Sequence, residues 1–318
     1  MTERETFAET FSYWYYRSAE WAARTLPERV GRKLFAAAAS VEHARNHGQR
    51  RVVARNLSRV LGKPAGSPEV RAAVREAFDS YGRYWYDTFL LRSMPAQEFR
   101  KRFEMRGLEI IDAALERGRG GLFCLPHLGN WDAAGRWMTL HGYSLTAVAE
   151  TLRPERLFRL FLQHREELGM KILPLAGTRR VGEELLGLIS RNEVIALVSD
   201  RDLKGRGVDV EMFGATRKLP AGPALLSLTS GSPLIPCAMY DTVDDGWLCL
   251  ITEPIEVERT GVLRNDVAAL TRKLAGRFEE FISAAPTQWH MWQPAWPEDE
   301  IDAPHGSGLE PAPAEGPG

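Results

Sequence analysis

The chain has 318 residues, 44% of them hydrophobic, and a formal net charge of −1. A chain of this length can bury one large α/β core or two smaller ones, so it needs neither a disulfide nor a metal to fold. The cysteines Cys124, Cys237 and Cys249 lie in apolar surroundings and form no Cys-x-x-Cys pair. They are typical of buried free thiols, and the composition argues against a disulfide-rich or zinc-stapled protein.

The N-terminal region is locally basic. Its first 65 residues hold twelve Lys or Arg against six Glu, a formal net charge of +6. The acidic residues Glu3, Glu5 and Glu9 are unlike the basic start of a signal peptide. No apolar run reaches the roughly 18 residues that span a bilayer. We therefore expect a protein without a membrane span, attached peripherally to the cytoplasmic face of the plasma membrane.

Two features of this region predict contact with an anionic membrane surface. Aromatic residues recur at helical spacing and include tyrosines of the kind that settle at lipid headgroups; they are Phe7, Phe11, Trp14 and Trp21, with Ser18 in the same series, and Tyr13, Tyr15 and Tyr16. A cationic band follows, formed by Arg45, Arg50, Arg51, Arg55 and Arg59. The alternative is an ordinary helix that packs its aromatic side chains into the core. No recognition-helix, RNP or zinc-finger pattern is present, so we expect no nucleic-acid partner.

The remaining chain alternates helical and strand-like segments, which predicts an α/β fold with a central, mostly parallel β-sheet flanked by helices. Ser67-Pro68-Glu69 begins a helix, whose expected buried face is Val70, Val74, Phe78, Tyr81, Trp85 and Phe89. Strands are predicted at 121–125, 145–149, 171–175, 194–199, 234–239 and 247–251. Helices are predicted at 130–138, 154–168, 181–191, 222–230 and 267–284. The Gly and Phe-Gly positions at 205, 207 and 213–214 predict a turn and a hairpin.

The domain organisation follows from these patterns. We expect one domain at 1–297, with a helical, membrane-facing part at 1–95 and an α/β catalytic part at 96–297. Residues 298–318 are rich in Pro and Gly and have almost no apolar bulk, which predicts a disordered tail.

The strand at 121–125 leads to His127, and Asp132 follows five residues later at the start of a helix. A carboxylate that orients a histidine makes it a general base. The chain has no Gly-x-Ser-x-Gly elbow, so the pattern favours attack by the substrate's own hydroxyl, as in acyl transfer to an alcohol. The alternative is a loop histidine beside a carboxylate that the helix dipole favours. No further His or Cys has ligand spacing, so we expect no metal and no cofactor.

Seven blocks occur in an order that resembles the bacterial lipid acyltransferases with a His-x-x-x-x-Asp motif. They are residues 126–135, 149–155, 164–169, 199–203, 213–214, 220–224 and 289–296. Within that superfamily they are more similar to the phosphatidylinositol mannoside acyltransferases of actinobacteria than to the late acyltransferases of lipid A synthesis. The resemblance covers roughly residues 10–297 and implies a glycerolipid-acyltransferase-like fold. The Ala-, Arg- and Gly-rich composition agrees with an actinobacterial source.

The resemblance implies roles for individual residues. It makes His127 the base and Asp132 its partner, and adds Glu150, Arg165 and Asp200 to the site. Asp200 stands where that family is expected to carry Glu, which shortens the side chain by one methylene. His127, Glu150 and Asp200 also follow predicted strand ends, the edge where ligands bind in open α/β sheets.

Two arginines keep more than one interpretation. Arg165 is expected either to clamp a phosphate or carboxylate or to make an ion pair with Glu155 or Glu166. Arg201 is expected either to join an ion-pair cluster or to contact the pyrophosphate of coenzyme A. His290, among tryptophans, is predicted to be a packing residue.

The reaction implied by the resemblance is transfer of a long acyl chain, such as palmitoyl, from acyl-CoA. The implied acceptor is the 6-hydroxyl of the mannose on inositol position 2 of phosphatidylinositol mannosides, with no acyl-enzyme. Backbone N–H groups near Leu128 and Gly129 are candidates for holding the oxyanion. Two alternatives stay open: a lipid A late acyltransferase, and a non-catalytic lipid-binding module.

Overall fold

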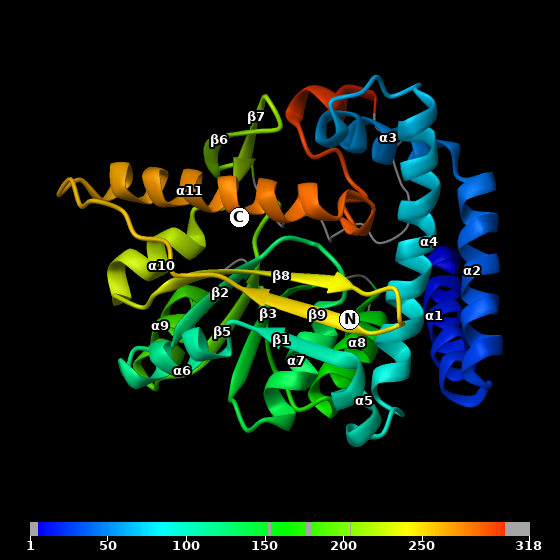
Figure 1. The fold of residues 1–318 in the computed structure, drawn as a ribbon, viewed down its shortest axis with the longest axis horizontal. Coiled ribbons are helices and arrows are strands. Elements are labelled where there is room, and N and C mark those ends of the chain that lie inside the picture. Colours follow the sequence, from blue (N-terminus) through cyan, green and yellow to red (C-terminus); the bar gives the residue numbers. More distant parts are fainter. Residues whose placement is uncertain (1–5, 152–153, 176–179, 204, 303–318) are drawn as a thin grey trace.

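A seven-stranded β-sheet with helices on both faces forms the centre of the protein (Figure 1). This computed structural model describes residues 6–151, 154–175, 180–203 and 205–302. The strand order is β1-β9-β8-β2-β5-β3-β4. The strands are β1 (Phe103–Arg106), β2 (Gly121–Leu125), β3 (Leu145–Glu150), β4 (Lys171–Leu175), β5 (Val194–Val198), β8 (Leu234–Asp241) and β9 (Trp247–Ile251).

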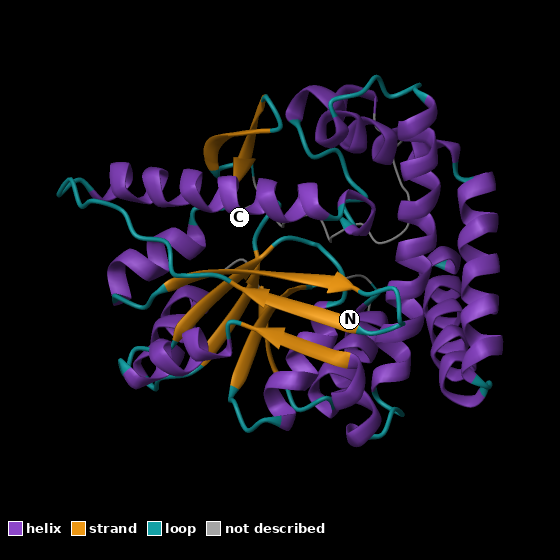
Figure 2. Ribbon diagram, in the orientation of Figure 1, coloured by secondary structure: helices purple, strands orange, loops and turns teal. Residues whose placement is uncertain are grey.

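The sheet is mostly parallel. β8 and β9 are joined as an antiparallel pair, and the other neighbouring pairs of this sheet run parallel. β2, β5 and β3 are therefore adjacent and end at the same edge. A separate two-stranded hairpin, β6 (Val208–Met212) and β7 (Ala215–Leu219), lies beside α11 (Figure 2).

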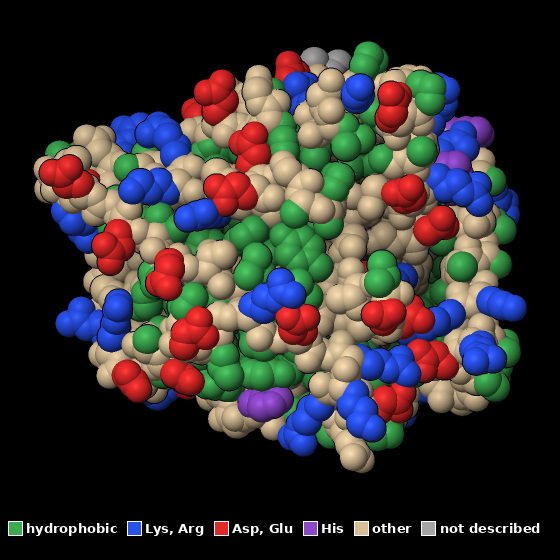
Figure 3. Space-filling model, viewed as in Figure 1, with side chains coloured by type: hydrophobic (Ala, Val, Ile, Leu, Met, Phe, Trp, Pro, Cys, Tyr) green, Lys and Arg blue, Asp and Glu red, His purple; other side chains and the backbone are tan. Residues whose placement is uncertain are grey.

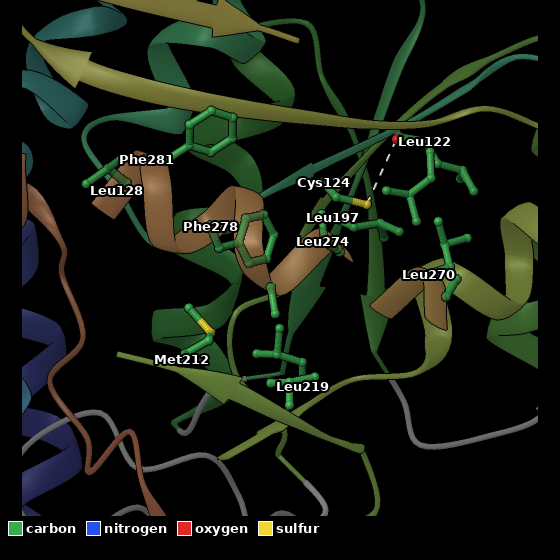
Figure 4. Packing of buried hydrophobic residues seen from close by; sticks show 14 of the residues in the cluster. Leu122, Cys124, Leu128, Leu197, Met212, Leu219, Leu270, Leu274, Phe278 and Phe281 are labelled. Carbon is green, nitrogen blue, oxygen red and sulfur yellow. Dashed lines mark hydrogen bonds between the residues drawn. The ribbon is translucent and has the colours of Figure 1, made fainter. Parts of the chain in front are cut away.

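Side chains of β2 alternate between two hydrophobic cores because successive residues of a strand point to opposite faces. Leu122 and Cys124 belong to the core under α11, while Phe123 and Leu125 belong to the core on the other face. Figure 4 shows Phe278 of α11 within the first of these cores. The first core includes residues of α9 (Arg180–Ser190), α10 (Gly222–Ser230) and α11 (Leu263–Ala284). The second includes residues of α5 (Ala96–Arg102), α6 (Leu108–Glu116) and α7 (Trp131–Leu140).

The N-terminal helices stand beside the sheet and are connected through α4 (Figure 1). They are α1 (Phe7–Thr25), α2 (Glu28–Arg45), α3 (His47–Leu61) and α4 (Pro68–Leu91), and α8 (Glu155–Glu167) packs against α1. Ser67 caps α4 by accepting a hydrogen bond from the backbone N–H of Val70, as predicted. The predicted inner face of α4 is confirmed: Val70, Val74, Phe78 and Phe89 are buried, and Tyr81 and Trp85 are partly buried.

The α/β class and the helical N-terminal region are confirmed. β2, β4, α10 and β9 coincide with the predicted ranges, and the other predicted elements differ by a few residues at their ends. The pattern missed α5, α6 and the four-residue β1. β1 lies at the sheet edge, where pairing with β9 supplies a strand too short to show a sequence period.

The beginning of the predicted disordered tail is structured. A short 3₁₀ helix, η2, spans Pro297–Asp302. Asp299 pairs with Arg59 of α3, with 3.3 Å between the carboxylate and guanidinium atoms, which ties this segment to the N-terminal helices. The rest of that prediction, residues 303–318, lies outside the described residues.

The aromatic residues of α1 divide between two environments. Tyr16 packs against Trp85 and Phe161, whereas Trp14 and Trp21 are 58% and 65% exposed. Phe11 and Tyr15 are also more than half exposed. One face of α1 therefore packs against the rest of the protein, as the alternative interpretation expects, and the other face exposes aromatic side chains. Within the part of the chain that the structure describes, no helix is long and apolar enough to cross a bilayer.

The predicted cationic band is split. Arg45 and Arg51 are exposed, and Figure 3 shows Lys and Arg side chains along the edge of the molecule where α2 lies. Arg59 instead pairs with Glu298 and Asp299 and lies over the Trp296 ring. The band is therefore not one continuous basic face, because the C-terminal segment neutralises part of it.

Candidate active site

His127 lies just beyond the end of β2, between this strand and α7. Its Nδ1 lies 2.5 Å from Oδ1 of Asp200, and its backbone N–H donates to Oδ2 of the same carboxylate at 3.1 Å. Nε2 makes no hydrogen bond to any residue in the described ranges, and a quarter of the side chain is exposed. The ring is thus held at one nitrogen and accessible at the other, which is the arrangement that a general base requires.

Asp200 follows β5 and is fully buried. Its Oδ2 accepts a second hydrogen bond, from the indole Nε1 of Trp289 at 2.8 Å. Burial by itself would raise the pKa of this carboxyl group, but the charge and hydrogen bond of His127, the Trp289 hydrogen bond and the nearby Arg217 lower it to about 2. Asp200 is therefore ionised at neutral pH and can stabilise a protonated His127.

The predicted pairing of His127 with Asp132 is wrong. Asp132 lies in the first turn of α7 and is almost fully buried, and its Oδ1 accepts a hydrogen bond from Nε of Arg165 on α8 at 2.8 Å. Its Oδ2 has no hydrogen-bond partner within the described structure. Asp132 follows His127 after four intervening residues, but the helix directs this carboxylate towards α8. The carboxylate on His127 comes instead from the end of the neighbouring strand.

Arg165 makes an ion pair, as one of its two interpretations expects, but the partner is Asp132 in place of Glu155 or Glu166. The carboxylate of Asp132 outweighs the effect of burial and raises the pKa of the guanidinium above its ordinary value. Tyr84 of α4 lies near this guanidinium. Burial and the Asp132 charge raise the pKa of Tyr84 well above the ordinary value, so its hydroxyl stays protonated.

Glu150 and Arg201 form an ion pair between the ends of β3 and β5. Arg201 also donates to the side-chain oxygen of Gln293. Both side chains of the pair remain about one-fifth exposed. This ion pair agrees with the interpretation of Arg201 as part of an ion-pair cluster. Both charged groups lie near Asp200, at the carboxyl edge of the sheet.

The backbone after His127 is held tightly. The N–H of Leu128 donates to the carbonyl of Pro126 at 2.7 Å, and the N–H of Gly129 donates to the carbonyl of Gln288 at 3.0 Å. Both N–H groups that the sequence suggested for the oxyanion are therefore already engaged. Gly129 has φ +57°, and a Cβ atom here would lie 2.4 Å from the carbonyl oxygen of Met239. Only glycine fits this turn without displacing β8.

Aromatic rings pack beside His127. The Trp131 ring meets the His127 ring edge-on at 5.6 Å between centroids, and Tyr84 packs on Trp131 at 4.9 Å. His290 is buried against Tyr81 and Tyr84 and hydrogen-bonds to Ser80, so its predicted packing role is confirmed.

Sequence reasoning missed several residues around Asp200. Trp289 belongs to the last of the seven quoted blocks, but no local pattern linked its N–H to a carboxylate 89 residues away. Arg217 sits on the inward-facing side of β7 and is buried, a position where the alternation of the strand predicts an apolar residue.

The site offers few groups for a metal. Among the described residues, no cluster of three or more His, Cys, Asp or Glu side chains is arranged to hold an ion. Its charged groups are instead engaged in carboxylate pairs with His127, Arg165 and Arg201.

An α/β sheet that presents a histidine and its carboxylate at the carboxyl ends of adjacent strands has the arrangement typical of an enzyme site. The family model described as bacterial lipid A biosynthesis acyltransferase matches residues 2–298. The chain belongs to this family, so the protein is an acyltransferase, and the resemblance seen in the seven blocks is confirmed.

Curated relatives cover nearly the whole chain. A phosphatidylinositol mannoside acyltransferase of Mycobacterium tuberculosis is 37% identical over 300 residues, which are 93% of this chain and 92% of that relative. The protein of the same name from a second strain of this species is 36% identical over 300 residues. One from Mycolicibacterium smegmatis is 37% identical over 288 residues, 90% of this chain and 91% of that relative.

Proposed function

We propose that the protein transfers a long-chain acyl group, such as palmitoyl, from acyl-CoA to a phosphatidylinositol mannoside. The acceptor is the 6-hydroxyl of the mannose on inositol position 2. The observation that carries the reaction type is the geometry of His127, whose Nδ1 is held by Asp200 while Nε2 is accessible. The substrate class is supported by the names of the mycobacterial relatives.

The reaction proceeds in one ternary complex. Nε2 of His127 takes the proton of the mannose hydroxyl as the oxygen attacks the thioester carbonyl. The new C–O bond forms a tetrahedral intermediate, and its collapse breaks the C–S bond. The imidazolium then returns the proton to the departing thiolate of coenzyme A. Asp200 stabilises the imidazolium throughout, as its low pKa supports, and no acyl-enzyme forms.

The other charged pairs bind and shape the site. Arg165, held by Asp132, presents a cation for a phosphate group of either substrate. Asp132 acts through this arginine. Arg201 and Glu150 remain partly exposed at the sheet edge, where Glu150 accepts hydrogen bonds from sugar hydroxyls and Arg201 contacts the pyrophosphate of coenzyme A.

The protein works while bound peripherally to the cytoplasmic face of an anionic plasma membrane. The exposed aromatic side chains of α1 and the basic N-terminal region support this location. A lipid acceptor with two acyl chains stays in the bilayer, so the enzyme has to approach its headgroup at that surface.

Incorporation of labelled palmitate from palmitoyl-CoA into mono- and dimannosylated phosphatidylinositol tests the proposal. We expect labelled product with the native chain and a loss of about 100-fold or more with His127→Ala. The matched control is His141→Ala, which changes an exposed histidine at the far end of α7. Product on lipid A precursors alone would assign the chain to that acceptor class. Full turnover by His127→Ala would disprove the assigned base.

A further inference from the structure

The segment Gln288–His290 crosses the loop that carries His127. The N–H of His290 donates to the carbonyl of His127 at 2.7 Å, and the carbonyl of Gln288 accepts from the N–H of Gly129 at 3.0 Å. Leu128 and Trp289 form an antiparallel bridge between these two hydrogen bonds. A C-terminal strap, residues Gln288–His290, therefore fixes the backbone on both sides of the His127 loop.

The same strap reaches the carboxylate that holds His127. The indole N–H of Trp289 donates to Oδ2 of Asp200 at 2.8 Å, while Oδ1 faces Nδ1 of His127 at 2.5 Å. Trp289 is 3% exposed and Asp200 is fully buried, so water does not compete for this hydrogen bond. Each carboxylate oxygen thus has its own donor side chain, and rotation of the carboxylate would break both hydrogen bonds.

Arg217, on β7 of the β6–β7 hairpin, contacts both Asp200 and Trp289. Its side chain is buried, and Nη2 donates to the backbone carbonyl of Asp200 at 2.5 Å. The guanidinium lies 5.8 Å from the Trp289 ring and 5.2 Å from the Trp296 ring, within the range of cation–π contact. A buried positive charge therefore lies beside the buried carboxylate and packs against the tryptophan that orients it.

We propose that Trp289 is a positioning residue for the acyl-transfer reaction: its indole N–H fixes the Asp200 carboxylate so that Oδ1 orients His127. The inference rests on the proposed function for the role of His127 as base. Trp289 contacts neither substrate nor the reacting atoms and acts through Asp200. Its effect on the reaction is therefore on kcat, with little change in the KM of either substrate.

Trp296 supplies a matched control. It is also fully buried and lies over Arg217, and its ring centroid is 6.2 Å from that of Trp289. Its indole nitrogen, however, has no hydrogen-bond partner within the described residues. Trp289→Phe and Trp296→Phe therefore remove the same atoms from the same cluster, but only the first removes a hydrogen bond to Asp200.

The first experiment compares steady-state kinetics of the two variants. A hydrogen bond to a charged group predicts a kcat loss of about 10- to 100-fold for Trp289→Phe, with KM values within about twofold. Trp296→Phe is expected to retain kcat within about threefold. In an Asp200→Ala background, Trp289→Phe should lower kcat further by less than about twofold. Equal losses in the two tryptophan variants, or the full Trp289→Phe loss without Asp200, would overturn the proposal.

A variant that preserves shape keeps the test valid if Trp289→Phe folds poorly. Replacing Trp289 with 3-benzothienylalanine exchanges the indole N–H for sulfur and keeps the two fused rings. The kcat loss should match that of Trp289→Phe while the melting temperature stays near the native value. A native kcat in this variant would show that the N–H has no role.

Solvent exchange of the Nδ1 proton of His127, measured by NMR on histidine-labelled protein, gives a readout that needs no substrate. We expect slow exchange in the native chain and in Trp296→Phe, and faster exchange in Trp289→Phe. If the native protein transfers no acyl group to any mannoside, the proposed function fails while this measurement still decides the role of Trp289. Unchanged exchange in Trp289→Phe would overturn the positioning role in either case.

Discussion

Nδ1 of His127 and Oδ1 of Asp200 lie 2.5 Å apart, although 73 residues separate them in the chain. Each residue follows a strand, and the two strands, β2 and β5, are hydrogen-bonded neighbours that run parallel. Asp132, the acidic residue near His127 in the sequence, pairs instead with Arg165. Two acidic residues of the site therefore have different partners, and their substitutions should have different effects.

Replacing the carboxylate at His127 should reduce catalysis. We expect Asp200→Ala to lower kcat by about 100-fold or more, because the imidazolium loses the charge that stabilises it and Nδ1 loses its acceptor. Measurement of kcat and KM with palmitoyl-CoA and a mannosylated lipid checks this expectation. A smaller kcat loss than that of Asp132→Asn, at a temperature where both variants are folded, would contradict the assignment.

Replacing the carboxylate at Arg165 should reduce stability. Asp132→Asn leaves a partly buried guanidinium without its charged partner, so we expect the free energy of unfolding to fall by about 2 kcal/mol or more. Chemical denaturation measures this loss. The double variant Asp132→Leu/Arg165→Met removes both charges and should be more stable than Asp132→Asn. A double variant that is less stable than the single one would show that the ion pair stabilises the fold by more than the burial of its two charges destabilises it.

The turn after His127 depends on a glycine. Gly129→Ala places a Cβ atom against the carbonyl of Met239 and keeps a positive φ, so we expect a loss of at least about 2 kcal/mol in unfolding free energy. Gly142→Ala is the control, because Gly142 also has a positive φ, of +83°, but no atom within 4 Å of the added Cβ. Thermal melts of both variants test this difference. Equal melting temperatures would mean that the loop can shift to accept the Cβ atom without loss of unfolding free energy.

The exposed face of α1 should mediate membrane binding. Each of Phe11, Trp14 and Trp21 exposes about three-fifths of its side chain, and burial of three such surfaces predicts that the triple serine variant binds about 100-fold more weakly. Sedimentation with vesicles containing anionic phosphatidylinositol measures the partition. Val243→Ser, a change at a 98% exposed residue of the β8–β9 turn, should leave binding unchanged. If the triple variant binds the vesicles as tightly as the native chain does, this face is not the membrane-binding surface.

A buried histidine should make the protein sensitive to acid. His164 is 3% exposed, and burial, with the charges of Arg165 and Arg92, lowers its pKa to about 4. Because the unfolded chain protonates this histidine near pH 6.5, its contribution to stability is present above that pH and is lost as the pH falls towards 4. At pH 5 the loss corresponds to about 2 kcal/mol.

His164→Leu should remove this part of the pH dependence, since both ring nitrogens lack hydrogen-bond partners among the described residues. Denaturation at several pH values between 5 and 8 measures it. Asp241 contributes the opposite slope, because burial and the Asp87 charge raise its pKa to about 7 despite Arg83. The native chain and the variant are therefore compared at each pH. Parallel profiles would show that His164 does not titrate with unfolding.

The sequence by itself determined most of the helices and strands and the edge of the sheet at which the site forms. Short apolar strands that end before His127, Glu150 and Asp200 predicted three polar side chains at one edge, and β2, β3 and β5 end there. This prediction succeeded because a buried strand appears in the sequence as a short apolar run, and because parallel neighbouring strands have their carboxyl ends at the same edge of the sheet. The seven blocks also identified the family.

Only the tertiary structure decided which side chains meet. The order of the strands places Asp200 next to His127, and the direction of α7 places Asp132 next to Arg165. Neither contact can be predicted from the spacing of these residues along the chain. The strap that brings Trp289 onto Asp200 spans an even longer separation. Local sequence patterns determine periodicity and capping within an element, whereas hydrogen bonds between distant residues depend on how the elements pack together.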